Sequence, residues 1–352
     1  LIGEELRFHA GDGGGNFAPP QVAPSPVLGA HSVAAGDFAP TPGLGDGLVT
    51  EIVAASNGST ATAVAIDGDS AYLAGSFDGT LKAKGSAARG VFVQRIGATQ
   101  GWPKTWAAKP DENLRVTSVD VRAETLAVAL SRSTSGRPPR ATIEALDLDG
   151  KQRWTVELEA KVGFATIADV AVADDGAVYA VGSFTGVMDI AGSTLRADGL
   201  ADGFIVAIAA DGKPTWAQRF GGAEGDQATA IAYSPAVGVI VTGWFSGEAA
   251  VQRATVKSND ESIDGLVMRL RPDGALLWVR QLGGAGTDTL TDVAISGNQL
   301  AVLGTFERAL LAGTKPIESA GSSDILLATM SAEGEAHQLQ TVGGPGPDVA
   351  NG

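Results

Sequence analysis

Residues that could act as nucleophiles, bases or metal ligands are few in this chain, and they lie far apart in the sequence. Cysteine is absent, and the three histidines, His9, His31 and His337, have no metal-ligand spacing to one another. A Ser-His-Asp triad or a histidine-based metal site is therefore hard to assemble. Paired carboxylates can transfer protons, but the sequence brings no two of them together. We therefore predict no catalytic, metal-binding or cofactor-binding residues.

Three aspartates recur after Gly-Gly pairs, namely Asp226, Asp288 and Asp348. Calcium would need several such oxygens to converge on one centre. Because these aspartates lie one repeat apart, we expect each to cap its own turn by accepting backbone N–H groups. The glycine pairs precede neither a helix nor a lysine, so they indicate turns rather than a phosphate-binding loop.

Tryptophan rings could stack on a ligand, but their spacing favours a structural role. An Asp-Gly pair precedes Trp154, Trp216 and Trp278 at the same distance, and the Gly positions of these pairs, 150, 212 and 274, differ by 62 and 62. Trp106 is assigned to the same place one unit earlier. Equivalent positions predict that each ring packs against the next unit. Trp102 and Trp244 depart from this pattern, and Trp244 is the candidate for a surface or channel contact.

A second marker, Gly-x-Phe, repeats with nearly the same period. Its glycines at 182, 243 and 304 are separated by 61 and 61 residues. A fixed period of this size indicates a repeat architecture. The marker residues are Gly75 and Phe77, Gly182 and Phe184, Gly243 and Phe245, and Gly304 and Phe306.

Each repeat contains four short apolar or alternating runs separated by Gly, Asp or Pro. In the clearest copy, at residues 161–222, an Asp-Gly turn at 211–212 separates two of these runs, which is a strong hairpin signal. Four antiparallel strands per repeat predict the blade of a β-propeller. We therefore predict an all-β fold, a single β-propeller with full blades at residues 60–110, 111–160, 161–222, 223–284 and 285–344. The second copy is the most divergent, with Ala129 assigned to the glycine of Gly-x-Phe.

The two ends of the chain differ from the repeats. Residues 1–30 are rich in Pro and Gly and are expected to form an extended arm, which leaves the propeller to residues 31–352. Residues 31–58 and 345–352 carry partial matches to the repeat, so we predict that they complete one composite blade. That gives six blades, with five or seven remaining open.

Composition narrows the classes of partner. With 25 basic and 40 acidic residues, the formal charge of −15 would repel nucleic acid. The uncharged stretch Gln227–Gly247 is long enough to span a bilayer. Pro and Gly interrupt it, so it is predicted to form two buried strands and no membrane span.

Taken together, the markers resemble those of the SBBP-type bacterial β-propeller repeat. The best copy combines Asp264-Gly265-Leu266, Asp273-Gly274, Trp278, Gly283-Gly284, Asp288 and Gly304-Thr305-Phe306. The resemblance implies an exported bacterial propeller, periplasmic, secreted or at the cell surface. A narrower resemblance, over residues 146–154, is to the tryptophan-docking repeat of quinoprotein-like (PQQ-type) propellers. The enzymes of that group typically carry adjacent cysteines, which this chain lacks.

The leading functional prediction is a non-enzymatic scaffold that binds an unidentified protein, free or within a larger envelope complex. The alternative is a propeller enzyme, either a degenerate quinoprotein or a glycan-active protein with a site in the central channel. A structural envelope subunit anchored by the amino-terminal arm is a third reading. Co-purification with a partner would distinguish such a subunit from a free secreted protein.

Overall fold

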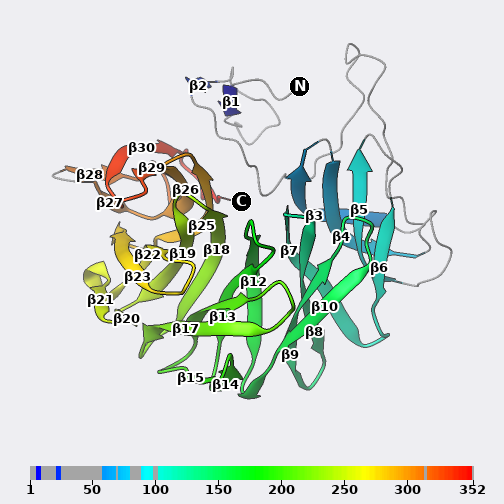
Figure 1. Cartoon of the computed structure of the whole chain (residues 1–352). Coiled ribbons are helices and arrows are strands. Elements are labelled where there is room, and N and C mark those ends of the chain that lie inside the picture. Colours follow the sequence, from blue (N-terminus) through cyan, green and yellow to red (C-terminus); the bar gives the residue numbers. More distant parts are fainter. Residues whose placement is uncertain are drawn as a thin grey trace, which may run out of the picture. The chain divides into compact units, whose positions relative to one another are not determined.

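The computed structural model describes residues 58–68, 70–79, 89–97, 102–312 and 315–350, together with the backbone of β1 (Glu5–Phe8) and its antiparallel partner β2 (Gln21–Pro24). The chain divides into two compact units, residues 31–219 and residues 1–30 with 220–352. Four-stranded antiparallel arrangements make up most of each unit (Figure 1).

The unit formed by residues 31–219 holds three of these sheets, each with its strands in the order of the sequence. Blade 1 contains β3 (Gly58–Asp67), β4 (Ser70–Asp78), β5 (Arg89–Gly97) and β6 (Pro103–Ala107). Blade 2 contains β7 (Glu112–Arg122), β8 (Thr125–Thr134), β9 (Arg137–Leu146) and β10 (Gln152–Leu158). Blade 3 contains β12 (Ala165–Val172), β13 (Val178–Phe184), β16 (Asp202–Ile208) and β17 (Pro214–Gly222), the last of which continues into the second unit.

The other unit holds two more sheets of the same kind. Blade 4 contains β18 (Asp226–Ser234), β19 (Gly238–Ser246), β22 (Ile263–Leu270) and β23 (Leu276–Leu282). Blade 5 contains β25 (Thr289–Ser296), β26 (Gln299–Phe306), β29 (Asp324–Ser331) and β30 (Ala336–Val342). The predicted fold class is confirmed: the chain is an all-β propeller built from four-stranded antiparallel blades.

The structure adds hairpins that the repeat pattern did not predict. Between its second and third strands, each of blades 3 to 5 inserts a short hairpin, which pairs with the segment entering that blade. These hairpins are β14 (Val187–Ile190) with β15 (Ser193–Arg196), β20 (Glu248–Val251) with β21 (Ala254–Lys257), and β27 (Ala309–Ala312) with β28 (Lys315–Glu318). The entering segments are β11 (Ala160–Val162), the end of β17, and β24 (Gly284–Ala285); a 3₁₀ turn, η1 (Asn259–Glu261), follows β21.

In blades 1, 3, 4 and 5 the glycine of Gly-x-Phe lies opposite a β-bulge in the first strand. In blade 3 the register shifts between Ile167 and Asp169, opposite Gly182. A Cβ atom on Gly182 would lie 1.9 Å from the Thr166 carbonyl oxygen, and one on Gly75 would lie 2.0 Å from that of Thr60. Glycine therefore removes the clash that the bulged strand would create.

Register also corrects the alignment of blade 2. The bulge there lies between Val116 and Ser118, and the residue opposite Val116 is Leu130. Leu130 rather than Ala129 therefore occupies the glycine position, and Arg132 occupies the position of the phenylalanine. In the other blades that phenylalanine is at most 4% exposed.

Apolar side chains of successive sheets meet in shared cores within each unit. One core joins Val93 of blade 1 to Val119 and Val128 of blade 2. Another joins Ile143 of blade 2 to Phe204 of blade 3, and blades 4 and 5 share a third. The composite blade predicted from residues 31–58 and 345–352 lies mostly outside the described residues. Of its carboxyl end, residues 345–350, the structure shows a bridge between Ser323 and Pro347.

Candidate functional site

Three tryptophans dock on the turn of the following blade. The indole N–H of Trp154 donates to the Ala210 carbonyl at 2.9 Å, and that of Trp278 donates to Ala332 at 2.9 Å. Trp102, which the spacing left outside the repeat, makes the corresponding bond to Leu148 at 2.7 Å. Each ring covers the glycine of the turn that receives it, at positions 212, 334 and 150. These rings hold blades together and are not available as an aromatic platform.

The other three tryptophans, Trp106, Trp216 and Trp244, lie on β6, β17 and β19. Trp106 is 9% exposed and donates to the Glu144 carboxylate at 2.9 Å. The Trp216 ring lies 6.0 Å from that of Tyr179 in the same blade. Trp244, the predicted surface contact, is half-buried on β19, with its ring beside Gly225. Trp102 rather than Trp106 is thus the blade 1 counterpart of Trp154.

The aspartates after the Gly-Gly pairs accept backbone N–H groups of their own turns. Asp226 accepts from Gly222 at 2.8 Å, and Asp288 accepts from Gly284 at 2.7 Å. Asp348 accepts from Gly344 at 2.8 Å. Across the described part of the chain, no group of three or more His, Asp or Glu side chains is arranged to hold a metal ion. His337 lies exposed on β30, whereas His9 and His31 fall outside the described residues.

Two positions at the junctions between blades carry buried aspartates in the later repeats. The first is the residue of the third strand that pairs with the phenylalanine of Gly-x-Phe; it is Asp202, Asp264 or Asp324 in blades 3, 4 and 5. The second lies at or close to the start of the first strand of the following blade; Asp288, just before β25, holds it beside Asp264. In blade 1 the third-strand position is Gly90, opposite Phe77, and in blade 2 the first-strand position is Leu114, opposite Arg132.

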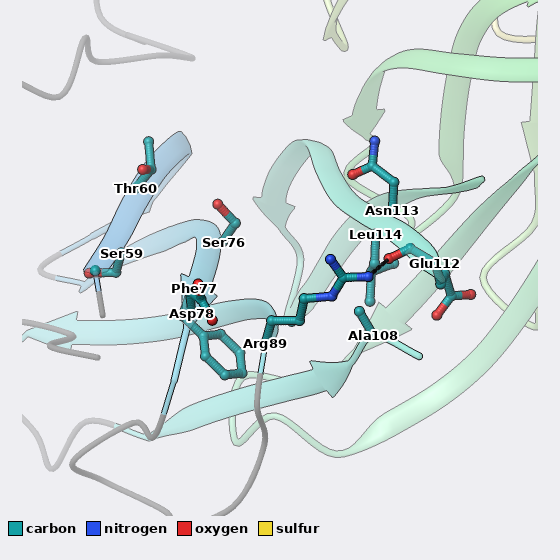
Figure 2. Close-up of a pocket in the computed structure, with 12 residues that line it drawn as sticks. Ser59, Thr60, Ser76, Phe77, Asp78, Arg89, Ala108, Glu112, Asn113 and Leu114 are labelled. Atoms are coloured by element: carbon teal, nitrogen blue, oxygen red, sulfur yellow. Dashed lines mark hydrogen bonds between the residues drawn. The ribbon is translucent and has the colours of Figure 1, made fainter. Parts of the chain in front are cut away.

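The junction between blades 1 and 2 therefore lacks both carboxylates, and a pocket of about 410 Å³ opens there. Its volume lies within the range of small-molecule sites. Residues from β3, β4, β5 and β7 line it (Figure 2), namely Gly58, Ser59, Thr60, Ser76, Phe77, Asp78, Arg89, Gly90, Ala108, Glu112, Asn113 and Leu114.

Arg89 crosses the pocket from β5 and is anchored on the turn that enters blade 2. Its Nη2 atom donates to the carbonyl oxygens of Lys109, Pro110 and Glu112 at 3.0, 2.7 and 2.7 Å. Its Nη1 and Nε atoms make no hydrogen bond to any other described residue. The anchored guanidinium therefore retains donors that can face a ligand.

Groups that donate hydrogen bonds and groups that accept them surround Arg89. Asp78 and Asn113 are exposed, as are Ser59 and Thr60, while Ser76 is half-buried. The Glu112 carboxylate is engaged elsewhere, since it accepts the Lys109 backbone N–H at 3.1 Å and pairs with Arg132 at 3.4 Å. Figure 2 shows this carboxylate turned away from Arg89. Asp78 is consequently the carboxylate of the pocket lining that is open to a ligand.

Phe77 and Leu114 form the apolar part of the lining. They are only 4% and 6% exposed, so neither presents a flat face for stacking. Recognition in this pocket must therefore depend on hydrogen bonds. Sequence reasoning missed the site because its residues come from four strands and share no local motif.

Comparisons with known proteins place few limits on function. No family model matches the chain, and no curated protein matches it. A solved structure that is similar is a GH43 β-xylosidase/α-arabinofuranosidase from a compost microbial metagenome, in complex with xylotriose. The identity is 13% and the TM-score is 0.36, with coverage of 89% of this chain and 98% of that one. No residue role passes from that enzyme to this chain at such a level of likeness.

The prediction of a non-enzymatic scaffold is corrected on this point, because the comparison returns an enzyme. That prediction took the lack of a local catalytic motif as a sign that the chain has no enzymatic activity. A blade architecture does not justify that step, since neighbouring groups such as Asp78, Arg89 and Asn113 come from different strands. The alternative stated with it, a glycan-active propeller, stays a proposal.

Across the described residues, the structure contains no helix of the length and apolar character that a bilayer crossing requires. The uncharged stretch Gln227–Gly247 instead forms most of β18 and β19, which pair with each other.

Proposed function

We propose that this chain is a glycan-active propeller whose pocket between blades 1 and 2 binds a neutral, hydroxyl-rich sugar. The supporting observation is the anchored Arg89, with donors to spare, beside the exposed Asp78 and Asn113. Neighbouring sugar hydroxyls both donate and accept. They match a lining that offers a guanidinium donor, a carboxylate acceptor and groups that do both.

The charges favour a neutral ligand over an anionic one. Arg89 and Asp78 offset each other, and Arg132 offsets Glu112. The whole chain carries a formal charge of −15, which disfavours the approach of anions. Without a stacking platform, we expect weak binding, with a dissociation constant on the order of 0.1–1 mM.

Calorimetric titration with a panel of neutral disaccharides tests this proposal, with a uronic acid as the charged comparison. Asp78→Asn keeps the size of the side chain and removes its charge, and the exposed position of Asp78 limits any effect on folding. Loss of a charge-assisted hydrogen bond of about 1.5–3 kcal/mol should weaken binding roughly tenfold to a hundredfold. The control is Asp67→Asn, an exposed aspartate at the other end of β3.

The proposal fails if no neutral sugar binds, or if Asp78→Asn binds as well as the parent protein does. Chromatography of each sugar after incubation tests for turnover. Asp78 is the carboxylate placed to exchange a proton with a bound ligand. Turnover that Asp78→Asn abolishes and Asp67→Asn preserves would assign that role.

The SBBP-type resemblance adds a separate proposal, that the protein is exported by a bacterium. Fractionation of the producing cells, followed by immunodetection, tests it. Detection in the cytoplasmic fraction alone would contradict it.

A further inference from the structure

The junction between blades 4 and 5 buries two carboxyl groups. Asp264, at the start of β22, is 0% exposed, and Asp288, just before β25, is 1% exposed. The backbone joins the two blades at the same place, because the Asp288 N–H donates to the Ile263 carbonyl at 2.8 Å. Ile263 and Thr287 also form a parallel bridge. Any change in charge at this junction therefore acts directly on the contact between the blades.

Asp264 organises the segment that precedes it. Its carboxylate accepts hydrogen bonds from the Asn259 backbone and side chain at 3.1 and 2.8 Å, from the Ser262 hydroxyl at 3.1 Å, and from the Gln281 amide. Within this segment Asp260 and Glu261 have φ angles of 51° and 56°, which non-glycine residues adopt at a cost. Four donors directed at one carboxylate hold the strained turn in place.

Asp288 has a different balance of partners. It accepts the backbone N–H groups of Gly284 at 2.7 Å and Glu307 at 3.2 Å. Burial raises the pKa of its carboxyl group to about 7, the two backbone bonds oppose the shift, and the charges of Asp264 and Glu307 add to it.

Charged groups around Asp288 offer it no compensating cation. Glu307 follows β26 and accepts the Thr287 N–H at 3.3 Å, while Asp260 and Glu261 of η1 are exposed acids. The exposed Arg308 is next in sequence to Glu307. No described basic side chain forms an ion pair with Asp264, Asp288 or Glu307. Ionisation of Asp288 therefore places a buried negative charge beside those of Asp264 and Glu307.

We propose that the junction between blades 4 and 5 is a pH-sensitive latch, closed while Asp288 is protonated and loosened when it ionises. In the closed state the donors of Asn259 and Ser262 hold the segment before β22 on the Asp264 carboxylate. Ionisation of Asp288 adds repulsion at the point where Ile263 and Asp288 join the blades. The segment that responds first is the strained turn at Asp260 and Glu261.

Hydrogen exchange on the intact chain, measured by mass spectrometry from pH 5.5 to 8.5, tests the latch. After correction for the intrinsic rate, exchange in residues 258–264 and 283–288 should increase at least tenfold across this range. Asp288→Asn, which mimics the protonated state, should remove the increase. Asp348→Asn is the matched control, because Asp348 caps the equivalent turn from a half-exposed position and its N–H donates to Ser323 in the same way.

An increase that persists in Asp288→Asn, or that is absent from the parent protein, would overturn the proposal. If Asp288→Asn does not fold, carbon-13 NMR titration of the aspartate carboxyl groups of the parent protein decides the question. A carboxyl group that titrates near neutrality supports the latch, and titration of every aspartate below pH 5 refutes it.

Discussion

Gly212 allows a direct measurement of how strongly one blade docks on the next. It lies in the turn between β16 and β17 with a φ of +86°, beneath the Trp154 ring of the preceding blade. A Cβ atom at this position would lie 2.7 Å from Cγ of Trp154. Gly212→Ala must therefore displace the indole and with it the hydrogen bond to Ala210.

Gly192 supplies a matched comparison within the same unit. It has a φ of +73°, in the turn between β14 and β15, and a Cβ atom there would meet nothing within 4 Å. Both substitutions place alanine in the left-handed backbone region, which should lower the unfolding free energy by about 1 kcal/mol each. Gly212→Ala adds about 1–3 kcal/mol for overpacking and about 1 kcal/mol for the lost hydrogen bond. We expect losses of about 3–5 kcal/mol for Gly212→Ala and about 1 kcal/mol for Gly192→Ala.

Urea denaturation followed by tryptophan fluorescence measures both unfolding free energies. Displacement of Trp154 should also shift the native emission of Gly212→Ala to longer wavelength and leave that of Gly192→Ala unchanged. Equal losses within about 0.5 kcal/mol would show that the Trp154 contact contributes nothing to holding the two blades together. That result would refute the docking role of the repeated tryptophan.

Three further outcomes follow from buried charges. Arg219→Gln leaves Asp202, which is 0% exposed, without its cation. The unfolding free energy should fall by about 2 kcal/mol at pH 8, and by less at acid pH, where the carboxyl group is neutral. Thermal melts at both pH values check this. Trp106→Phe removes the donor to the buried Glu144 and should cost about 1–3 kcal/mol in urea denaturation. Since the pKa of Asp288 is raised to about 7, the folded state holds that proton more tightly than the unfolded chain does. The unfolding free energy should therefore fall by up to about 4 kcal/mol from pH 4 to 7 and then level off. A rise over this range would contradict the raised pKa.

The sequence was sufficient for features that depend on short-range spacing. Alternating apolar runs and Asp-Gly turns predicted the four-stranded blades, because strand period and turn chemistry are local properties. The turn-capping role of Asp226, Asp288 and Asp348 followed in the same way, since each bonds an N–H group four residues earlier. The inserted hairpins were missed, because their short strands are stabilised by pairing with the segment that enters the blade.

Only the tertiary structure decided which residues are equivalent between blades and where a ligand can bind. A bulge shifts Leu130 into the position that spacing assigned to Ala129, and indole docking assigns Trp102 the place that spacing gave to Trp106. The pocket is lined by Gly90 and Leu114, which occupy positions where the junction between blades 4 and 5 buries carboxylates. Those two residues lie on different sheets, so their shared role depends on strand register and blade contact, which no local pattern encodes.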